Sequence, residues 1–290
     1  MIGKFLDPKN DVAFKKIFGT EKNKDILIHF LNDILTFKGK YPIQEVTFLK
    51  TLQDPEIASQ KTSIVDILCK DEKGSNYIVE MQVAKTKGFE KRAQYYASKA
   101  YSSQANVGDD YQNLKEIIFL AIADYTMFPN KKEYHSDHVI LDKKNYNHDL
   151  KDFSFTFIEL PKFIKHANEL SNIQEKWCYF FKYAEETLLE DLERIIGKDG
   201  VIQRAYGELD RFGWSKEELL NYEQSEKQKN DYLSSLAQKF DEGRAEGRAE
   251  GEIVGVTKIV QALLKAGVSI DVIQATTGLS QKEIESLRQL

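Results

Sequence analysis

Two short hydrophobic runs, each interrupted by regularly spaced polar residues, flank Gly74. Residues 63–69 and 77–83 are rich in β-branched and aromatic side chains, and residues 71–75 between them have the composition of a turn. The pattern predicts a β-hairpin centred on this turn.

The register of the hairpin decides which side chains meet. With the turn centred on Lys73, Asp66 lies directly opposite Glu80, and Gln82 shares the face of Glu80 because side chains alternate along a strand. Both faces are largely apolar: Ile64, Leu68 and Ile78 share the carboxylate face, and Val65, Ile67, Val79, Met81 and Val83 lie on the other. Strands that are apolar on both faces are covered on both sides, so we expect the two carboxylates to be at least partly buried.

Two carboxylates that face each other across a ladder repel and destabilise the hairpin. A divalent cation between them removes this objection, because hard cations such as Mg²⁺ bind carboxylate oxygens. Asp66 and Glu80 are therefore a candidate metal site. The alternative is that both carboxylates lie on a solvated face, or that a bulge at Gly74 shifts the register.

The first 165 residues alternate between helical and strand-like patterns. Residues 11–35 read as a helix broken near Gly19, and residues 88–104 as a second helix. The expected strands are residues 43–50, 62–70, 76–84, 115–124, 138–141 and 154–160. The order of these elements predicts an α/β fold with a mixed sheet.

The helix expected at residues 88–104 carries a second polar stripe. Arg92, Tyr95, Tyr96, Lys99 and Ser103 fall on one face at helical spacing. A guanidinium, a phenol and an ammonium are suited to phosphate oxygens. The alternative is that Tyr96 belongs to the core and the other side chains form a solvated face.

Several segments together resemble the Rpn family of recombination-promoting nucleases, also described as putative transposases, within the PD-(D/E)XK superfamily. The resemblance covers about the first 165 residues and the composition of the tail. The matching segments are residues 7–8, 10–19 (NDVAFKKIFG), 29–35, 66, 80–82 (EMQ), 92–96 and 157–163.

The resemblance implies a restriction-endonuclease-like PD-(D/E)XK core, followed here by an all-α C-terminal region. It also implies a bacterial, cytoplasmic DNA endonuclease that uses Mg²⁺ or Mn²⁺. Asp66 and Glu80 would then be catalytic metal ligands, joined by the main-chain carbonyl of Met81, and Asp11 would be an auxiliary acid. Asp11 is equally explained as a residue of the first helical turn that interacts with the helix dipole.

Gln82 stands where the superfamily signature has a lysine. A neutral amide can still hydrogen-bond a water molecule, but it supplies no positive charge. The Rpn branch typically carries glutamine here, so the resemblance implies a catalytic role for Gln82 that positions the nucleophile. Lys85 could supply a displaced charge if the strand ends before it. Lys85, Lys87 and Lys99 are also candidates for contacts to the DNA backbone, and Arg92 and Tyr95 are possible auxiliary residues.

Composition restricts the possible classes of protein. The formal net charge of −5 gives no support for nucleic-acid binding, so a nuclease of this charge needs clustered basic residues. Cys69 and Cys178 each lie in an apolar run, which favours buried thiols over a disulfide. No run of about 18 apolar residues occurs, so we expect no membrane span, and the first residues lack the apolar stretch of a signal peptide.

The chain changes character after Pro161, its last proline. We expect a nuclease-like domain over residues 1–165 and a helical region over residues 166–240. The aromatic residues expected to anchor this helical region are Trp177, Tyr179, Phe180, Phe181, Phe212 and Trp214.

Residues 241–253 contain a Gly-Arg-Ala-Glu repeat, and glycines recur at 243, 247, 251 and, just beyond it, 255. In a helix the repeat does not bring Glu to Arg at i+3 or i+4, and each interior glycine costs about 1 kcal/mol. The segment is therefore either a flexible linker or a helix whose small residues let two copies approach closely. The second reading predicts a homo-oligomer formed through the C-terminal helices.

Residues 254–290 form a small helical module in this interpretation. Gly267 ends one helix, a second extends from Ser269 to Gly278, and Ser280 and Glu283 form a capping box for a third. The expected core residues are Val268, Ile273, Leu279, Ile284 and Leu287. The module resembles a helix-turn-helix, but the acidic residues of its last helix are poorly suited to a DNA groove and favour a protein contact.

Three functions remain open at this level. The first is a metal-dependent DNA endonuclease linked to recombination or mobile elements. The second is a nuclease fold that binds DNA or a partner after losing catalysis at Gln82. The third is an assembly factor whose tail carries the function.

Overall fold

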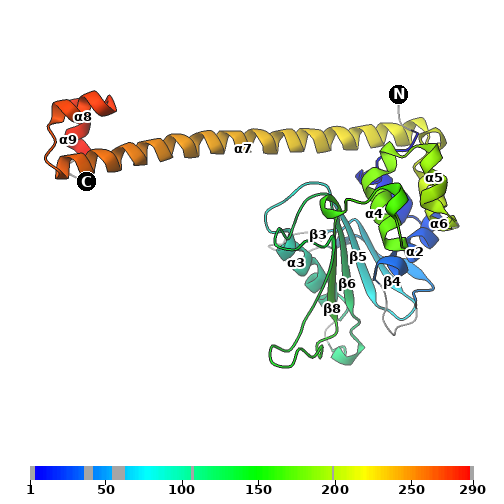
Figure 1. The fold of residues 1–290 in the computed structure, drawn as a ribbon. Coiled ribbons are helices and arrows are strands. Elements are labelled where there is room, and N and C mark those ends of the chain that lie inside the picture. Colours follow the sequence, from blue (N-terminus) through cyan, green and yellow to red (C-terminus); the bar gives the residue numbers. More distant parts are fainter. Residues whose placement is uncertain (1–3, 36–41, 54–62, 106–107, 198, 288–290) are drawn as a thin grey trace. The chain divides into compact units, whose positions relative to one another are not determined.

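The computed structural model describes residues 4–35, 42–53, 63–105, 108–197 and 199–287 (Figure 1). Contacts between Cα atoms divide the chain into two compact units, residues 1–226 and 227–290. Thr62, at the start of one expected strand, lies outside the described residues.

The first unit contains an α/β core followed by helices. Its strands are β1 (Val46–Phe48), β2 (Leu52–Gln53), β3 (Ser63–Ile64), β4 (Ile67–Asp71), β5 (Asn76–Gln82), β6 (Ile117–Ala123), β7 (His135–Val139) and β8 (Phe153–Glu159). Its helices are α1 (Asp11–Phe18), α2 (Lys24–Leu35), α3 (Phe89–Ser102), α4 (Ile173–Tyr183), α5 (Leu189–Ile196), α6 (Gly200–Glu208) and the start of α7 (Lys216–Lys265). The expected break near Gly19 is confirmed, because a single 3₁₀ turn (Glu21–Asn23) separates α1 from α2.

Six strands form one mixed sheet in the order β1-β4-β5-β6-β8-β7. β5, β6 and β8 are parallel, whereas β1, β4 and β7 each run antiparallel to their neighbours. The parallel strands are connected through α3 and through the long β6–β8 excursion that contains β7 (Figure 1). The predicted class, a mixed sheet flanked by helices and followed by a helical region, is confirmed.

The predicted hairpin register is also confirmed. β4 pairs with β5 so that Ile67 faces Val79 and Lys70 faces Asn76. The Asp71 carboxylate accepts hydrogen bonds from the main-chain N–H groups of Lys73 and Ser75, which closes the turn. Gly74 has a φ of 91°, a left-handed conformation that favours glycine.

Two separate cores cover the two faces of the sheet. Helix α3 packs on the face of Leu68 and Ile78, and α1, α2, α4 and α6 pack on the face of Ile67 and Val79 (Figure 1). Val65 was expected on the face of Ile67, but it lies in the core on the opposite face, with Leu68 and α3. The chain bends at Asp66 between β3 and β4, so strict alternation does not continue back through Asp66.

The helices after residue 165 share the larger core with α1 and α2. The ring of Phe18 lies 5.1 Å from Phe30, 5.6 Å from Phe181 and 6.0 Å from Trp177, measured between ring centroids. Of the expected aromatic anchors, Trp177, Phe180, Phe181 and Trp214 are buried, whereas the expectation for Phe212 is wrong because its side chain is 87 % exposed. The N-terminal segment is tied to α7 as well, since the main-chain N–H of Asp7 donates to the Tyr222 hydroxyl at 3.0 Å.

The second unit contains the rest of α7 together with α8 (Ile270–Thr277) and α9 (Gln281–Leu287). Val260, Ile273 and Ile284 form its buried core, with Val268, Leu279 and Leu287 packed around them. Gly267 and Gly278 both have positive φ at helix ends, and the Ser280–Glu283 capping box is present. The glycines and the capping box thus lie at helix ends where the sequence places them, and Arg288 lies outside the described residues.

Residues 241–253 are part of α7, which is one continuous helix. Arg248 and Glu252 form an i,i+4 ion pair at 3.3 Å, against the expectation that the repeat places no Arg four residues from a Glu. The reason is that Glu252 stands where the repeat would place another arginine.

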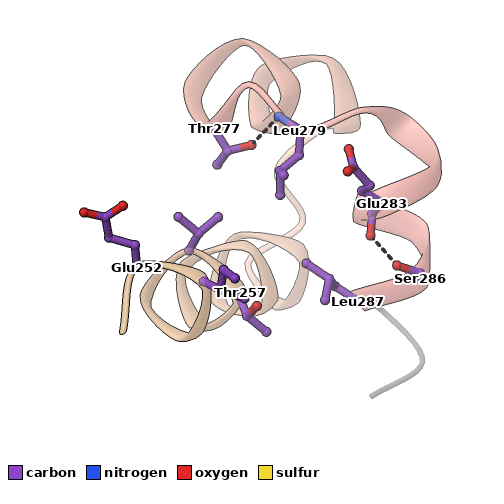
Figure 2. A pocket seen from close by; sticks show the side chains of 9 residues that line it. Glu252, Thr257, Thr277, Leu279, Glu283, Ser286 and Leu287 are labelled. Atoms are coloured by element: carbon purple, nitrogen blue, oxygen red, sulfur yellow. Dashed lines mark hydrogen bonds between the residues drawn. The ribbon is translucent and has the colours of Figure 1, made fainter. Parts of the chain in front are cut away.

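A groove of about 420 Å³ lies beside the core of the second unit, between α7 and the α8–α9 pair (Figure 2). Its apolar wall includes Val256, Leu279 and Leu287. Both glutamates that line it are engaged within the unit, Glu252 with Arg248 and Glu283 with Ser280.

Within the described residues, no helix combines the length and the apolar character needed to cross a membrane. Cys69 and Cys178 are buried free thiols, as expected. Burial raises the pKa of the Cys69 thiol to about 12 and also raises the pKa of Cys178, so neither is a reactive thiolate near neutral pH.

We predict that Phe18→Ala lowers the free energy of unfolding by about 3–5 kcal/mol, because it removes a fully buried ring from the aromatic cluster. Phe212→Ala is the matched control and should change stability by less than about 0.5 kcal/mol, since its ring is exposed. Urea unfolding of the two variants measures both effects. Equal losses would contradict the described core.

Candidate active site

Asp66 and Glu80 meet at the open end of the β4–β5 hairpin. The main-chain N–H of Asp66 donates to Glu80 Oε1 at 3.2 Å, and the main-chain N–H of Met81 donates to Asp66 Oδ2 at 2.8 Å. Glu80 is held on β5 and is only 3 % exposed, whereas Asp66 occupies the bend before β4. The structure thus brings together the two carboxylates that the sequence places opposite each other.

Burial and mutual repulsion disfavour two negative charges here. Burial, followed by the negative charge of Asp66, raises the pKa of Glu80 to about 8. Burial also raises the pKa of Asp66, although the hydrogen bond from Met81 and the charges of Lys15 and Arg92 act in the opposite direction. Near neutral pH the pair therefore holds a proton or requires a cation.

Gln82 connects Glu80 to helix α3. Its side-chain amide donates to Glu80 Oε2 at 2.9 Å, and its carbonyl accepts from Arg92 Nη2 at 2.5 Å. The Arg92 guanidinium lies over the ring of Phe89, 4.8 Å from its centroid, and 5.9 Å from that of Tyr96. Its Nε is buried without a hydrogen-bond partner among the residues described, so the site contains an unsatisfied donor.

Helix α1 supplies a cation that the sequence analysis overlooked. Lys15 Nζ lies 2.7 Å from Asp11 Oδ1 and 4.0 Å from Asp66 Oδ1. Partial burial lowers the pKa of Lys15, but Asp11, Asp66 and Glu80 more than offset this, and the net shift is upward. The i,i+4 spacing of Asp11 and Lys15 was the available signal; their proximity to Asp66 depends on tertiary packing.

The structure places the other candidate residues on α1, on α3 and after the end of β5. Asp11 is exposed and reaches Asp66 through Lys15, and Tyr95 is exposed on α3. Lys85 and Lys87 are exposed, and Lys99 is half-buried on α3. Because β5 ends at Gln82, Lys85 lies beyond the strand and its side is not fixed by alternation.

The donor set fits a hard divalent cation. No cluster of three or more His, Cys, Asp or Glu side chains suited to a metal occurs in the part of the chain that is described. The protein therefore offers two carboxylates and no soft ligand at this point. Mg²⁺ is commonly bound by one or two carboxylates, with waters and substrate phosphates completing its coordination.

Two histidines, His135 and His138, lie in the same short segment as Asp137. Both lie on β7, an edge strand paired only with β8. His135 Nε2 lies 3.2 Å from Asp137 Oδ1, and Asp137 also accepts a hydrogen bond from Thr156 on β8. The polar groups of these side chains are therefore hydrogen-bonded to one another across the β7–β8 pair.

Comparison with known families places the chain in the same class as its geometry. Residues 8–239 match the family described as PD-(D/E)XK nuclease family transposase. The match spans most of the chain, and the protein therefore belongs to this family, which carries a nuclease-like fold. Searches of curated proteins and of solved structures found no match.

The raised pKa of Glu80 predicts a characteristic pH dependence of stability. The folded state retains a proton on Glu80 up to about pH 8, whereas the unfolded chain releases it near pH 4.3. Stability from this group is full below the unfolded pKa and is lost as pH rises toward 8. In metal-free buffer, Glu80→Gln should therefore gain stability relative to wild type between pH 5 and 8, by on the order of a few kcal/mol.

Urea unfolding at several pH values in EDTA measures this difference. The control is Glu90→Gln, which neutralises an exposed acid on α3 and should follow wild type at every pH. Parallel curves for wild type and Glu80→Gln would show that the Glu80 carboxylate is not strained in the fold.

Proposed function

We propose that this protein is a divalent-metal-dependent DNA endonuclease that hydrolyses phosphodiester bonds. The observation that carries the proposal is a pair of carboxylates, the buried Glu80 and the partly buried Asp66, each held by a main-chain hydrogen bond. The family assignment supports a nuclease-like fold and a nucleic-acid substrate. Its transposase description supports a role in DNA recombination or mobile elements. A bacterial, cytoplasmic location is part of the proposal and rests on the sequence resemblance alone.

Each residue of the site has a proposed task. Asp66 and Glu80 would hold Mg²⁺ or Mn²⁺, which when bound activates a water molecule and neutralises charge on the scissile phosphate. Gln82 has both ends of its amide fixed, so it orients Glu80 and can offer a hydrogen bond to the nucleophile. Arg92 holds Gln82 and carries the unsatisfied donor Nε. Lys85, Lys87, Lys99 and Tyr95 are exposed or half-exposed groups that would contact DNA backbone oxygens.

One observation favours a second function. Gln82 supplies no positive charge, and its amide is engaged by Glu80 and Arg92. A nuclease fold weakened at this position would bind DNA or a protein partner without cutting. Cleavage and salt-sensitive DNA binding distinguish the two functions.

We predict that wild-type protein nicks supercoiled plasmid in Mg²⁺ or Mn²⁺, and that Asp66→Asn and Glu80→Gln each lose at least about 10²-fold of this rate. Loss of a carboxylate that holds the metal removes a contribution of several kcal/mol to the transition state. DNA binding should be largely unchanged in both variants. Gel analysis of nicked and linear products measures the rate.

Glu90→Gln is the matched control for cleavage, because Glu90 is an exposed acid on the helix that flanks the site. Nicking that survives in Asp66→Asn would contradict the assignment. Folded wild-type protein that binds plasmid but never nicks it would favour the second function.

We also propose that α7 forms a homo-oligomer. Leu236, Phe240, Gly243, Gly247 and Val254 share one face of the helix, because 3.6 residues complete a turn. The three apolar side chains are exposed, and open space surrounds both glycines. Val260, which packs in the core of the second unit, falls on a different face. An exposed face with bulky residues at its ends and glycines between them suits a second copy of the same helix.

Charges beside the glycines favour a parallel arrangement of two copies. Glu242 and Glu246 precede the glycines and flank the face on one side, while Arg244 and Arg248 follow them and flank it on the other. In a parallel pair of helices, the glutamate side of one copy lies against the arginine side of the other, so Glu faces Arg. In an antiparallel pair, glutamate lies against glutamate and arginine against arginine. A dimer would allow cleavage of both strands.

We predict that light scattering gives a dimeric mass for the full chain and a monomeric mass for Arg244→Glu combined with Arg248→Glu. Oxidation should cross-link Leu236→Cys to itself and Val254→Cys to itself, since identical residues meet in a parallel pair. Cross-links that form only when the two variants are mixed would show an antiparallel pair. A monomeric wild type would contradict the proposal.

A further inference from the structure

We propose that Lys15 is a catalytic residue, whose ammonium on α1 takes the place of the positive charge that Gln82 cannot supply. The inference rests on the proposed nuclease function and adds a residue from outside the hairpin to it. The ammonium would contact a non-bridging oxygen of the scissile phosphate.

The position of Lys15 follows from the packing of α1. Ala13, Phe14, Ile17 and Phe18 are buried in the larger core and fix one side of the helix. The Asn10 side chain caps the first turn by accepting from the main-chain N–H of Val12 at 2.9 Å. Asp11 and Lys15 share the remaining side, which faces the end of the hairpin where Asp66 lies.

The charges around Lys15 keep it cationic and close to the carboxylates. Asp11 Oδ1 lies 2.7 Å from Nζ and holds the ammonium, so Asp11 is a positioning residue for Lys15. Asp66 Oδ1 lies 4.0 Å from Nζ, a distance at which the ammonium can turn toward a phosphate placed against the carboxylates. The Lys15 side chain is nearly half-exposed, so a substrate can reach it.

Other cations are less well placed for this task. Arg92 is committed to Gln82 and to the rings of Phe89 and Tyr96. Lys85 and Lys87 are exposed beyond the end of β5. Lys15 reaches the carboxylates from α1 rather than from the hairpin or α3, and its ion pair with Asp11 holds it there.

The ammonium stays protonated throughout the proposed reaction. The oxygen of a water molecule forms a bond to phosphorus, the P–O3′ bond breaks, the released 3′ oxygen takes a proton from solvent, and the water loses a proton to solvent. The products are a 5′-phosphate and a 3′-hydroxyl. Lys15 stabilises the negative charge that develops on the phosphate oxygens, which is the task of an electrostatic donor.

The test compares Lys15→Met, Lys15→Arg and the control Lys91→Met, in which an exposed lysine of α3 is changed. Single-turnover nicking in saturating Mn²⁺ and DNA should fall about 10²–10³-fold in Lys15→Met, be partly restored in Lys15→Arg, and stay unchanged in Lys91→Met. Mn²⁺ affinity of the protein without DNA, measured by electron paramagnetic resonance, should be equal or tighter in Lys15→Met, because an ammonium competes with the metal for Asp66.

The opposite signs of these two effects separate catalysis from structure. If Lys15→Met binds Mn²⁺ more tightly and cleaves as fast as wild type, Lys15 only neutralises the carboxylates in the metal-free protein, and the inference is overturned. If cleavage, Mn²⁺ affinity and melting temperature all fall together, the role is structural, and the inference is again overturned. Failure of the wild type to cleave would instead refute the proposed nuclease function on which the inference rests.

Discussion

The repulsion between two carboxylates, the buried Glu80 and the partly buried Asp66, is the constraint on which the rest of this site depends. Glu80 accepts a hydrogen bond from the main-chain N–H of Asp66, and Asp66 accepts one from the main-chain N–H of Met81. Burial raises the pKa of both carboxyl groups. A fold gains nothing in stability from such a pair, because an apolar pair would fill the same place without the cost of removing charge from water. We therefore propose that the pair serves to bind a metal ion.

The surrounding elements fix this pair from three directions. The hairpin register sets the two carboxylates opposite each other, and cores on both faces of the sheet keep water away from β5. Helix α3 places Arg92 against Gln82, and α1 places Lys15 beside Asp66. Cations from two helices that are far apart in the sequence thus lie close to the negative pair. The net acidic charge of the whole chain therefore does not give the sign of the electrostatic potential at this site.

The sequence predicts those features that depend on residues close together along the chain. It does not predict side-chain positions that are set by contacts between distant segments. Period-two patterning and the turn at Gly74 were sufficient to place Asp66 opposite Glu80, since register follows from turn geometry and a buried face. Lys15 was missed because its position depends on the packing of α1 against helices more than 150 residues away, among them the one that contains Phe181. Phe212 and Trp214 are both aromatic residues of one short segment. Trp214 is buried and its indole N–H donates to the Glu208 carbonyl, whereas the Phe212 ring is exposed.

Calorimetric titration of the full chain with Mn²⁺ at pH 7, in two buffers of different ionisation enthalpy, tests the central claim most directly. If Glu80 and Asp66 bind the metal together, Glu80 must lose the proton that it retains up to about pH 8, so binding should release about one proton. Glu80→Gln should abolish both the binding and the release. Mn²⁺ binding without proton release, or binding that persists in Glu80→Gln, would contradict the assignment of the carboxylate pair as a metal site.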